Sequence, residues 1–272
     1  MMRSLWTGAS GMIAQQTNVD TIANNLSNVN TSGYKSEKTE FKSLLYQTLQ
    51  TKTTSANGEE KPISAQVGLG ARVASNTSIF TQGSLIANES KSAFAIEGNG
   101  LFSVRGADGE TYYTRNGNFS WVKDGNVVSL CTQEGYHVLD SNGNVISLPA
   151  NVSSESVEFQ SNSGEIGYKD GAGNYHALNR RIGIYQFRNP AGLEKESNSL
   201  LSVTEASGDA MSEYTNNNLT RSKIVQGYLE GSNVQLADEM VNLIVAQRAY
   251  EMNSKVITTS DDMLGIANQL KR

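Results

Sequence analysis

The 272-residue chain contains few of the residues from which active sites are usually built. Cys131 is its single cysteine, and His137 and His176 are its two histidines. One cysteine excludes an internal disulfide and a cysteine-based metal cluster. The sequence also lacks the GxSxG, HExxH and GxxxxGK[ST] motifs of common hydrolases, metalloproteases and nucleotide-binding proteins. We therefore expect no catalytic residue, no cofactor, no metal site and no enzymatic activity.

Two segments resemble ligand-binding loops only superficially. A GxG pattern at residues 68–70 follows a polar segment and precedes no helix, so we do not expect a dinucleotide loop there. The segment that begins at Asp140 lacks the glycine of a calcium loop at its sixth position, and Asn151 stands where the bidentate glutamate belongs. We interpret this segment as a hairpin turn.

Charge and hydropathy limit the class of partner. The formal net charge of −5 argues against binding to nucleic acid. No apolar run approaches the roughly 18 residues that are needed to span a bilayer, so we expect no membrane insertion. The N-terminal stretch, residues 1–18, contains one arginine and no sustained apolar run, and it does not resemble a Sec-type signal peptide.

A heptad pattern predicts a long helix over residues 4–30. Its apolar positions are Leu5, Met12, Val19 and Leu26, seven residues apart, together with Ile22 and Val29. This spacing is typical of a coiled-coil seam. Gly8 and Gly11 would each weaken such a helix by about 0.5–1 kcal/mol relative to alanine. Close approach of a neighbouring backbone would offset that cost.

A second and longer helix is predicted over residues 232–270. Its apolar rows are Leu236, Leu243, Tyr250, Ile257 and Leu264, and beside them Ala249, Val256, Met263 and Leu270. Ser232 and Gln235 fit a capping box at its start. Because one helix covers only part of this surface, we expect other copies of the chain to cover the rest. The alternative is an amphipathic helix that lies on the protein's own β-domain.

Amide side chains crowd the end of the first helix, at Asn24, Asn25, Asn28 and Asn30. Asparagine is unfavourable inside a helix because its amide competes for backbone hydrogen bonds. Arg3 and Asp20 are the only charged residues of the first 34. We interpret this uncharged end as one that bonds to neighbouring subunits, with a loop or a frayed helix as the alternative. Gly33 is expected to turn the chain in a left-handed conformation.

The middle of the chain predicts a compact antiparallel β-domain over residues 76–224. Turn signals such as Asp108-Gly109 and Asn142-Gly143 separate short alternating runs. Residues 36–75 read as an extended arm, and residues 51–66 have almost no apolar content. The predicted fold class is α+β. A discontinuous, coiled-coil-like helical domain from residues 1–35 and 225–272 accompanies the arm and the central β-domain.

The chain resembles the bacterial flagellar axial proteins of the rod and hook. The stretch ANNLSNVNTSGYK, at residues 23–35, matches the N-terminal signature of that family. Residues 228–270 are similar to its C-terminal motif, and residues 80–104 and 112–128 look like the start of its central β-domain. Residues 145–222 lie outside these motifs.

The resemblance implies a structural subunit of the basal-body rod that assembles into a helical tube and transmits torque. The RSLW opening at residues 3–6, the arm and the length favour a distal position over proximal rod or hook subunits. The implied partners are copies of the chain and neighbouring rod and hook proteins, with rings around the rod as further candidates. The resemblance also implies export by the flagellar type III apparatus to a place outside the cytoplasmic membrane. The rival hypothesis is a secreted adhesin that uses Tyr112, Tyr113, Trp121 and Tyr136 to bind a glycan.

Overall fold

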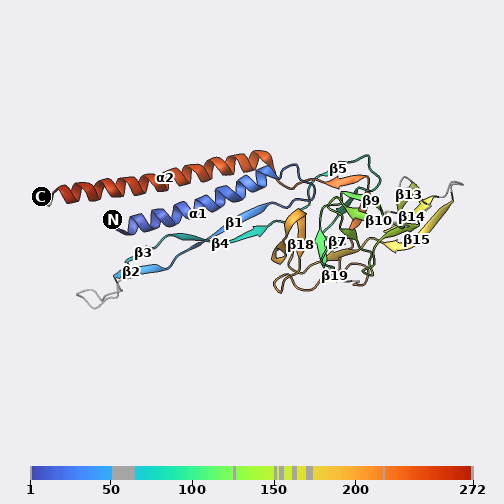
Figure 1. Ribbon diagram of the computed structural model, residues 1–272. Helices are drawn as coiled ribbons and strands as arrows, with labels where there is room; N and C mark the ends of the chain where they lie inside the picture. The colour runs from blue at the N-terminus through green and yellow to red at the C-terminus, as the bar shows by residue number, and fades with distance from the viewer. Residues whose placement is uncertain are drawn as a thin grey trace. The chain divides into compact units, whose positions relative to one another are not determined.

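The computed structural model describes residues 2–50, 65–124, 127–149, 152, 156–160, 164–169, 174–216 and 218–270. The chain divides into two compact units (Figure 1). Unit 1 consists of Met1–Ser27, Glu37–Ser78 and Gln235–Arg272, and unit 2 of Asn28–Ser36 and Ile79–Val234. Both ends of the chain therefore belong to the same unit. The predicted α+β fold class is confirmed.

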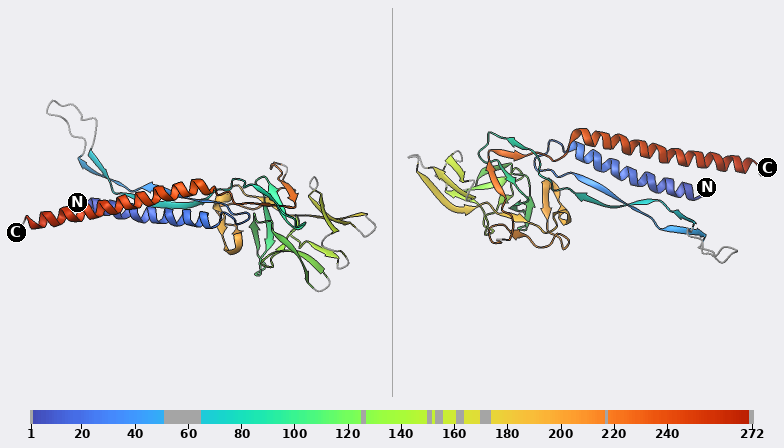
Figure 2. Two further views of the ribbon diagram at one scale, coloured as in Figure 1. Left: turned by 90° about the horizontal axis from the view of Figure 1, so that it is seen from above. Right: turned by 180° about the vertical axis from the view of Figure 1, so that it is seen from behind.

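Unit 1 contains the two predicted helices, α1 (Met2–Ser27) and α2 (Leu236–Gln269), side by side (Figures 1 and 2). Helix α1 ends at Ser27, so the helix predicted over residues 28–30 is a turn instead. The predicted capping box is also wrong. Gln235 is the N-cap and makes no side-chain cap hydrogen bond, while the Ser232 hydroxyl accepts a hydrogen bond from the Val234 amide at 3.3 Å.

The glycines of α1 allow the two helices to approach closely. A Cβ atom on Gly8 would lie 3.0 Å from Cγ1 of Ile257, and one on Gly11 would lie 2.8 Å from Nδ2 of Asn253. One turn nearer the start of α1, the hydroxyls of Ser4 and Ser260 are 3.1 Å apart. The small side chains thus permit a contact that offsets the low helix propensity of glycine.

The segment predicted as an arm forms two antiparallel ribbons in its described part. Strand β1 (Glu37–Ser43) pairs with β4 (Ala71–Ser78), and β2 (Tyr46–Gln50) pairs with β3 (Ala65–Gly68). Most of the polar segment predicted at 51–66 lies outside the described residues. The β1–β4 ribbon packs on α1 through a hydrogen bond of 2.9 Å from the Thr39 hydroxyl to that of Thr21.

Unit 2 is built from antiparallel strands. Its largest sheet runs in the order β12-β10-β11-β7-β8-β18-β17, with β9 beside β10, and with β16 between β7 and β19. Its strands are β7 (Leu101–Arg105), β8 (Thr111–Thr114), β9 (Phe119–Asp124), β10 (Val127–Thr132), β11 (His137–Val138), β12 (Ser147–Pro149), β16 (Ile184–Gln186), β17 (Glu194–Lys195), β18 (Leu200–Ser202) and β19 (Met211–Ser212). Two short 3-10 helices, η2 (Pro190–Gly192) and η3 (Ser197–Ser199), flank β17.

Three smaller sheets complete unit 2. They pair β13 (Val157–Gln160), β14 (Glu165–Lys169) and β15 (Tyr175–Arg181) in that order, β6 (Phe94–Glu97) with β20 (Lys223–Gln226), and β5 (Leu85–Ala87) with β21 (Tyr228–Glu230). The middle of the chain therefore forms antiparallel β-structure as predicted, but unit 2 extends beyond the predicted residues 76–224 to Val234 and includes Asn28–Ser36. Gly109 and Gly143 adopt the left-handed turn conformations that the sequence indicates, with φ of 84° and 80°.

The core of unit 2 is aromatic and aliphatic. Phe102 packs edge-on against Phe119 with ring centres 5.1 Å apart, and Tyr113 packs in the same way against Phe187 at 4.9 Å. Tyr112, Trp121 and Tyr136, the other aromatic residues of the adhesin hypothesis, are partly buried against this core. These side chains serve packing.

Asp140, Cys131 and His137, considered from the sequence as possible site residues, have partners within their own chain. The Asp140 carboxylate accepts hydrogen bonds of 2.8 Å from the amides of Asn142 and Asn144, as a hairpin turn requires. Sγ of Cys131 lies 3.2 Å from Nδ1 of His137, on the paired strands β10 and β11. Cys131 is buried, as expected for a small apolar residue.

Candidate functional site

The predicted seam residues are divided between buried and exposed positions. On α1, Ile22 is buried and Leu5, Met12, Val19 and Leu26 are half-buried. On α2, Leu243, Ile257 and Leu264 are half-buried, whereas Leu236 and Tyr250 are exposed. Val29 lies half-buried in the turn that begins unit 2.

Seven exposed apolar side chains form a stripe along α2 that α1 leaves uncovered. They are Val241, Val245, Met252, Val256, Met263, Ile266 and Leu270, with exposed fractions between 44% and 84%. Their spacing of three, four or seven residues places them on one side of the helix. Val256, Met263 and Leu270 belong to a row that the sequence predicts. We call the seven residues the α2 row.

Helix α1 adds two exposed apolar residues that were not among the predicted interface residues. Trp6 is 75% exposed and Ile13 is 67% exposed. Their separation of seven residues is a signal that could have found them, because it places both on the same side of the helix. The seam of half-buried leucines and valines obscured this second, weaker row.

A hollow of about 410 Å³ opens where the two helices meet. It is lined by Gln16, Val19, Gln247, Tyr250 and Glu251. It is large enough for a side chain of another molecule to enter between the helices. Val19 and Tyr250, two of the predicted interface residues, therefore line one concave feature.

The asparagines after the seam have different partners. The Asn25 side chain is 1% exposed; its Nδ2 donates to the Glu37 carbonyl at 2.8 Å, and its Oδ1 accepts from the Glu37 amide at 2.9 Å. Oδ1 of Asn28 accepts a hydrogen bond of 3.1 Å from the Thr31 hydroxyl. Asn24 is exposed on α1. Asn25 and Asn28, two predicted interface residues, thus bond within their own chain.

Gly33 follows this segment, and its place requires a glycine. Its φ is +72°, and its amide donates to the Glu230 carbonyl at 2.8 Å. A Cβ atom would lie 2.6 Å from the Asn116 nitrogen and 2.7 Å from the Arg115 carbonyl carbon. Both the backbone conformation and the close approach exclude other side chains without local rearrangement.

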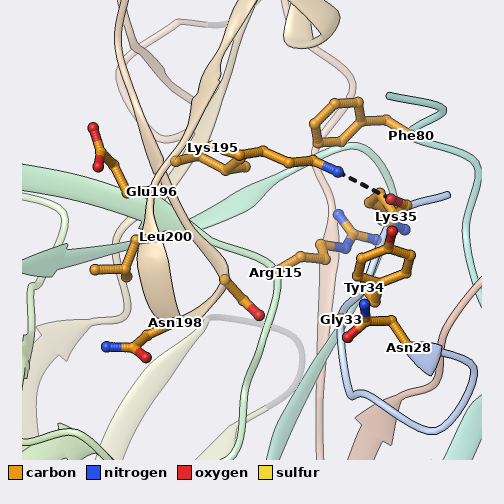
Figure 3. Close-up of a pocket in the computed structure, with 12 residues that line it drawn as sticks. Asn28, Gly33, Tyr34, Lys35, Phe80, Arg115, Lys195, Glu196, Asn198 and Leu200 are labelled. Atoms are coloured by element: carbon orange, nitrogen blue, oxygen red, sulfur yellow. Dashed lines mark hydrogen bonds between the residues drawn. The ribbon is translucent and has the colours of Figure 1, made fainter. Parts of the chain in front are cut away.

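Unit 2 contains a pocket of about 300 Å³ beside this turn (Figure 3). Tyr34, Phe80 and Arg115 line one side, and the β17–β18 hairpin lines the other. The Lys195 ammonium donates to the Lys35 carbonyl at 3.2 Å and lies 5.1 Å from the centre of the Tyr34 ring. The Lys195 ammonium therefore holds the β17–β18 hairpin to Tyr34 and Lys35.

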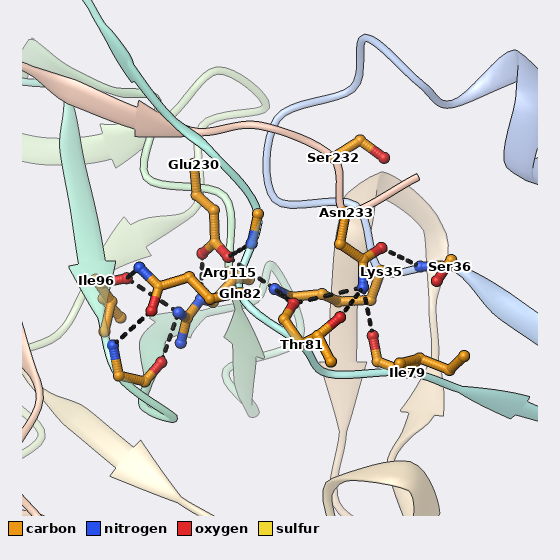
Figure 4. A network of polar contacts seen from close by, with 12 residues as sticks. Lys35, Ser36, Ile79, Thr81, Gln82, Ile96, Arg115, Glu230, Ser232 and Asn233 are labelled. Atoms are coloured by element: carbon orange, nitrogen blue, oxygen red, sulfur yellow. Dashed lines mark hydrogen bonds and ion pairs between the residues drawn. The ribbon is translucent and has the colours of Figure 1, made fainter. Parts of the chain in front are cut away.

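A buried polar network lies next to the pocket and joins residues that are far apart in the sequence (Figure 4). Oε1 of Glu230 accepts hydrogen bonds from the Lys35 ammonium at 2.7 Å and from the Gly83 amide at 2.9 Å. Oε2 of Glu230 pairs with Nε of Arg115. The three charged side chains are at most 5% exposed. Burial lowers the pKa of Lys35, and the Glu230 carboxylate opposes that shift.

No group of three or more His, Cys, Asp or Glu side chains within the described ranges is placed to hold a metal ion. Neither of the helices described here is long and apolar enough to cross a membrane.

Comparison with known proteins identifies the relatives of this chain. Residues 5–35 match the family model "Flagella basal body rod protein", residues 95–168 match "Flagellar hook protein FlgE/F/G D1 domain", and residues 225–270 match "Flagellar basal body rod FlgEFG protein C-terminal".

Curated relatives match along the whole chain. The chain is 44% identical to the flagellar basal-body rod protein FlgG of Borreliella burgdorferi over 100% of both sequences. It is 41% identical to the protein of the same name from Agrobacterium fabrum, over 98% of this chain and 99% of the relative. Identity to the flagellar hook-basal body complex protein FlhP of Bacillus subtilis is 31%, over 100% of both.

Proposed function

The chain belongs to the flagellar basal-body rod and hook family, and on that premise we propose that it polymerises with copies of itself through the exposed apolar residues of α1 and α2. It is a structural subunit of the distal rod of the bacterial flagellum. The proposal explains how the subunits are held together in a helical tube that transmits torque from the motor to the hook.

The α2 row is the observation that carries the proposal. Moving a half-exposed valine or methionine fully out of water contributes about 1 kcal/mol, so the seven residues of the row contribute about 7 kcal/mol. Association of two molecules costs an estimated 4–15 kcal/mol in lost freedom. A single contact along the row would barely offset that cost. Several neighbours for each subunit, as in a helical lattice, would offset it.

The remaining predicted interface residues fit this proposal to different degrees. Leu236 and Tyr250 are exposed and available to a neighbour, and Asn24 is exposed on α1. Asn25 and Asn28 bond within their own chain, so we assign the α1 contact to Trp6 and Ile13 instead. The half-buried leucines and valines of the seam serve chiefly to pair α1 with α2.

The proposal extends to the domains and partners named from the sequence. Of the terminal segments 1–35 and 225–272, the parts that contain α1 and α2 supply the polymerisation domain, whereas residues 28–35 and 225–234 belong to unit 2. Residues 36–75 act as an arm that braces an adjacent subunit. Rod and hook proteins, and rings that surround the rod, are the other proposed partners. Export by the flagellar type III apparatus would deliver the chain to its place outside the cytoplasmic membrane.

The test replaces two residues of the α2 row by charge. We expect the double variant Val256→Glu, Met263→Glu to fold as the native chain does, because both side chains are exposed, but to be absent from purified basal bodies. The matched control is Asn268→Glu, which adds a carboxylate at an exposed polar position of the same helix. Normal incorporation of the double variant into rods would refute the proposal.

A further inference from the structure

The chain passes between its two units four times. The crossings fall between residues 27 and 28, 36 and 37, 78 and 79, and 234 and 235. These four covalent connections take part in transmitting any force that acts on one unit and is resisted by the other. How the connections are tied on the unit 2 side therefore decides whether they take the force together or one after another.

Asn233 ties three of the crossing segments to one another. Its Oδ1 accepts a hydrogen bond of 2.7 Å from the Ser36 amide. Its Nδ2 donates to the Ile79 carbonyl at 2.8 Å and to the Thr81 hydroxyl at 2.9 Å (Figure 4). The Ile79 amide in turn donates to the Ser36 carbonyl at 2.8 Å. Residues next to the second, third and fourth crossings are thus joined by one side chain.

The buried charged side chains of Lys35 and Glu230 also join these three segments. The Lys35 ammonium donates to the Thr81 carbonyl at 2.7 Å as well as to Glu230. Glu230 also receives the Gly83 amide through its carboxylate and the Gly33 amide through its backbone carbonyl. The Lys35 ammonium and the Gly83 amide, from two of the segments, therefore both donate to the carboxylate of Glu230, which belongs to the third.

Arg115 fixes this carboxylate to the β-core. Its guanidinium pairs with Glu230 and donates to the carbonyls of Ile96, at 3.0 Å, and Gly98, at 2.6 Å. Ile96 belongs to β6 and is itself buried. The crossing segments are in this way bonded to the buried strand β6 of unit 2.

We infer that Lys35, Arg115, Glu230 and Asn233 form a junction clasp, whose function is to make the crossing segments carry torque together. Without the clasp, a force on one segment would separate β20 and β21, or residues 28–36, from the rest of unit 2 by breaking their hydrogen bonds one after another. With the clasp, the hydrogen bonds are loaded in parallel, and removal of Glu230 would leave two buried cations without their anion. The inference rests on the proposed function only for the source of the load.

A single-molecule pulling experiment on the full chain tests the clasp. Handles on cysteines introduced at the exposed positions Gln247 and Gln133 apply force between the units. We expect Glu230→Gln to raise the rate at which unit 2 opens, at a fixed force, at least tenfold. The matched control is Ile166→Ala, which removes a buried core side chain of β14 outside the clasp and lowers thermal stability.

The inference requires Glu230→Gln to open faster than a core variant that has lost as much thermal stability. Equal opening rates of the two at equal loss of melting temperature would overturn it. If Glu230→Gln does not fold, Asn233→Asp serves instead, since it keeps the acceptor for Ser36 and loses both donors. A native opening rate for Asn233→Asp would also overturn the clasp. Because each molecule is pulled alone, the outcome is independent of whether the chain polymerises as proposed.

Discussion

Replacing Asn25 by alanine tests why an amide lies inside α1. The side chain is 1% exposed and forms a reciprocal pair with the backbone of Glu37, donating at 2.8 Å and accepting at 2.9 Å. It therefore bonds the first residue of β1 to the last turns of α1, in the way that a neighbouring strand would. Alanine would leave both the amide and the carbonyl of Glu37 without this partner.

The expected cost follows from two opposing effects. Each buried backbone group that loses its partner costs about 1–3 kcal/mol. Glu37 is half-buried, so water partly replaces the amide and the lower half of that range applies to each group. Alanine recovers about 0.5 kcal/mol through its higher helix propensity. We expect Asn25→Ala to lower the free energy of unfolding by about 1.5–3.5 kcal/mol.

Two measurements check this expectation. Urea unfolding followed by circular dichroism gives the change in free energy, and hydrogen exchange read at the Glu37 amide reports the lost bond directly. The control is Gln16→Ala, which removes an exposed amide from the same helix and should change stability by less than about 0.5 kcal/mol. Unchanged protection of the Glu37 amide in Asn25→Ala would refute the role assigned to Asn25.

Two further predictions concern packing and pH. Gly11→Val should lower the free energy of unfolding by about 1–3 kcal/mol, because the new side chain meets Asn253. Gly265→Ala, where an added Cβ meets nothing within 4 Å, should instead raise it by about 0.5–1 kcal/mol; thermal unfolding measures both. Burial and the nearby Tyr185 raise the pKa of Tyr113 to about 12 from 10, so the unfolded chain loses this proton first and stability falls as pH rises between those values. Urea unfolding of Tyr113→Phe should show a shallower loss over that window, and identical pH profiles would contradict the assignment.

Periodicity predicted the two helices because a stripe of apolar residues is a local property of the sequence. It could not predict where they end. The asparagines of residues 23–35 are compatible with a helix or a turn. The choice depends on tertiary partners such as the backbone of Glu37, which forms hydrogen bonds with the Asn25 side chain. Ser232 and Gln235 have the spacing of a capping box, yet the neighbouring Asn233 bonds to Ser36 and Ile79, and the helix begins only at Leu236.

The junction clasp was invisible in the sequence for a related reason. Lys35 and Glu230 are separated by 195 positions; Glu230 stands among uncharged neighbours, whereas Lys35 precedes the mixed charges of Glu37 and Lys38. A lone lysine or glutamate in a sequence is typical of the solvent-exposed surface, since these residues are rarely buried unless paired. The pair is recognised only when the fold brings the two ends of the β-domain together. Gly33 carried the one local signal, because a left-handed turn can be expected from sequence alone.

The interface prediction shows which property a heptad pattern reports. Leu5, Met12 and Val19 obey the pattern and are half-buried, whereas Trp6 and Ile13 are the exposed apolar side chains of the same helix. A strong heptad marks the face with the most continuous apolar surface, and that face is covered first, by the helix of the same chain. In the proposed mode of assembly, the weaker row is what remains for other molecules. A residue that lies outside the main seam, and is nevertheless large and apolar, is therefore the better candidate for a contact between subunits than a residue within it.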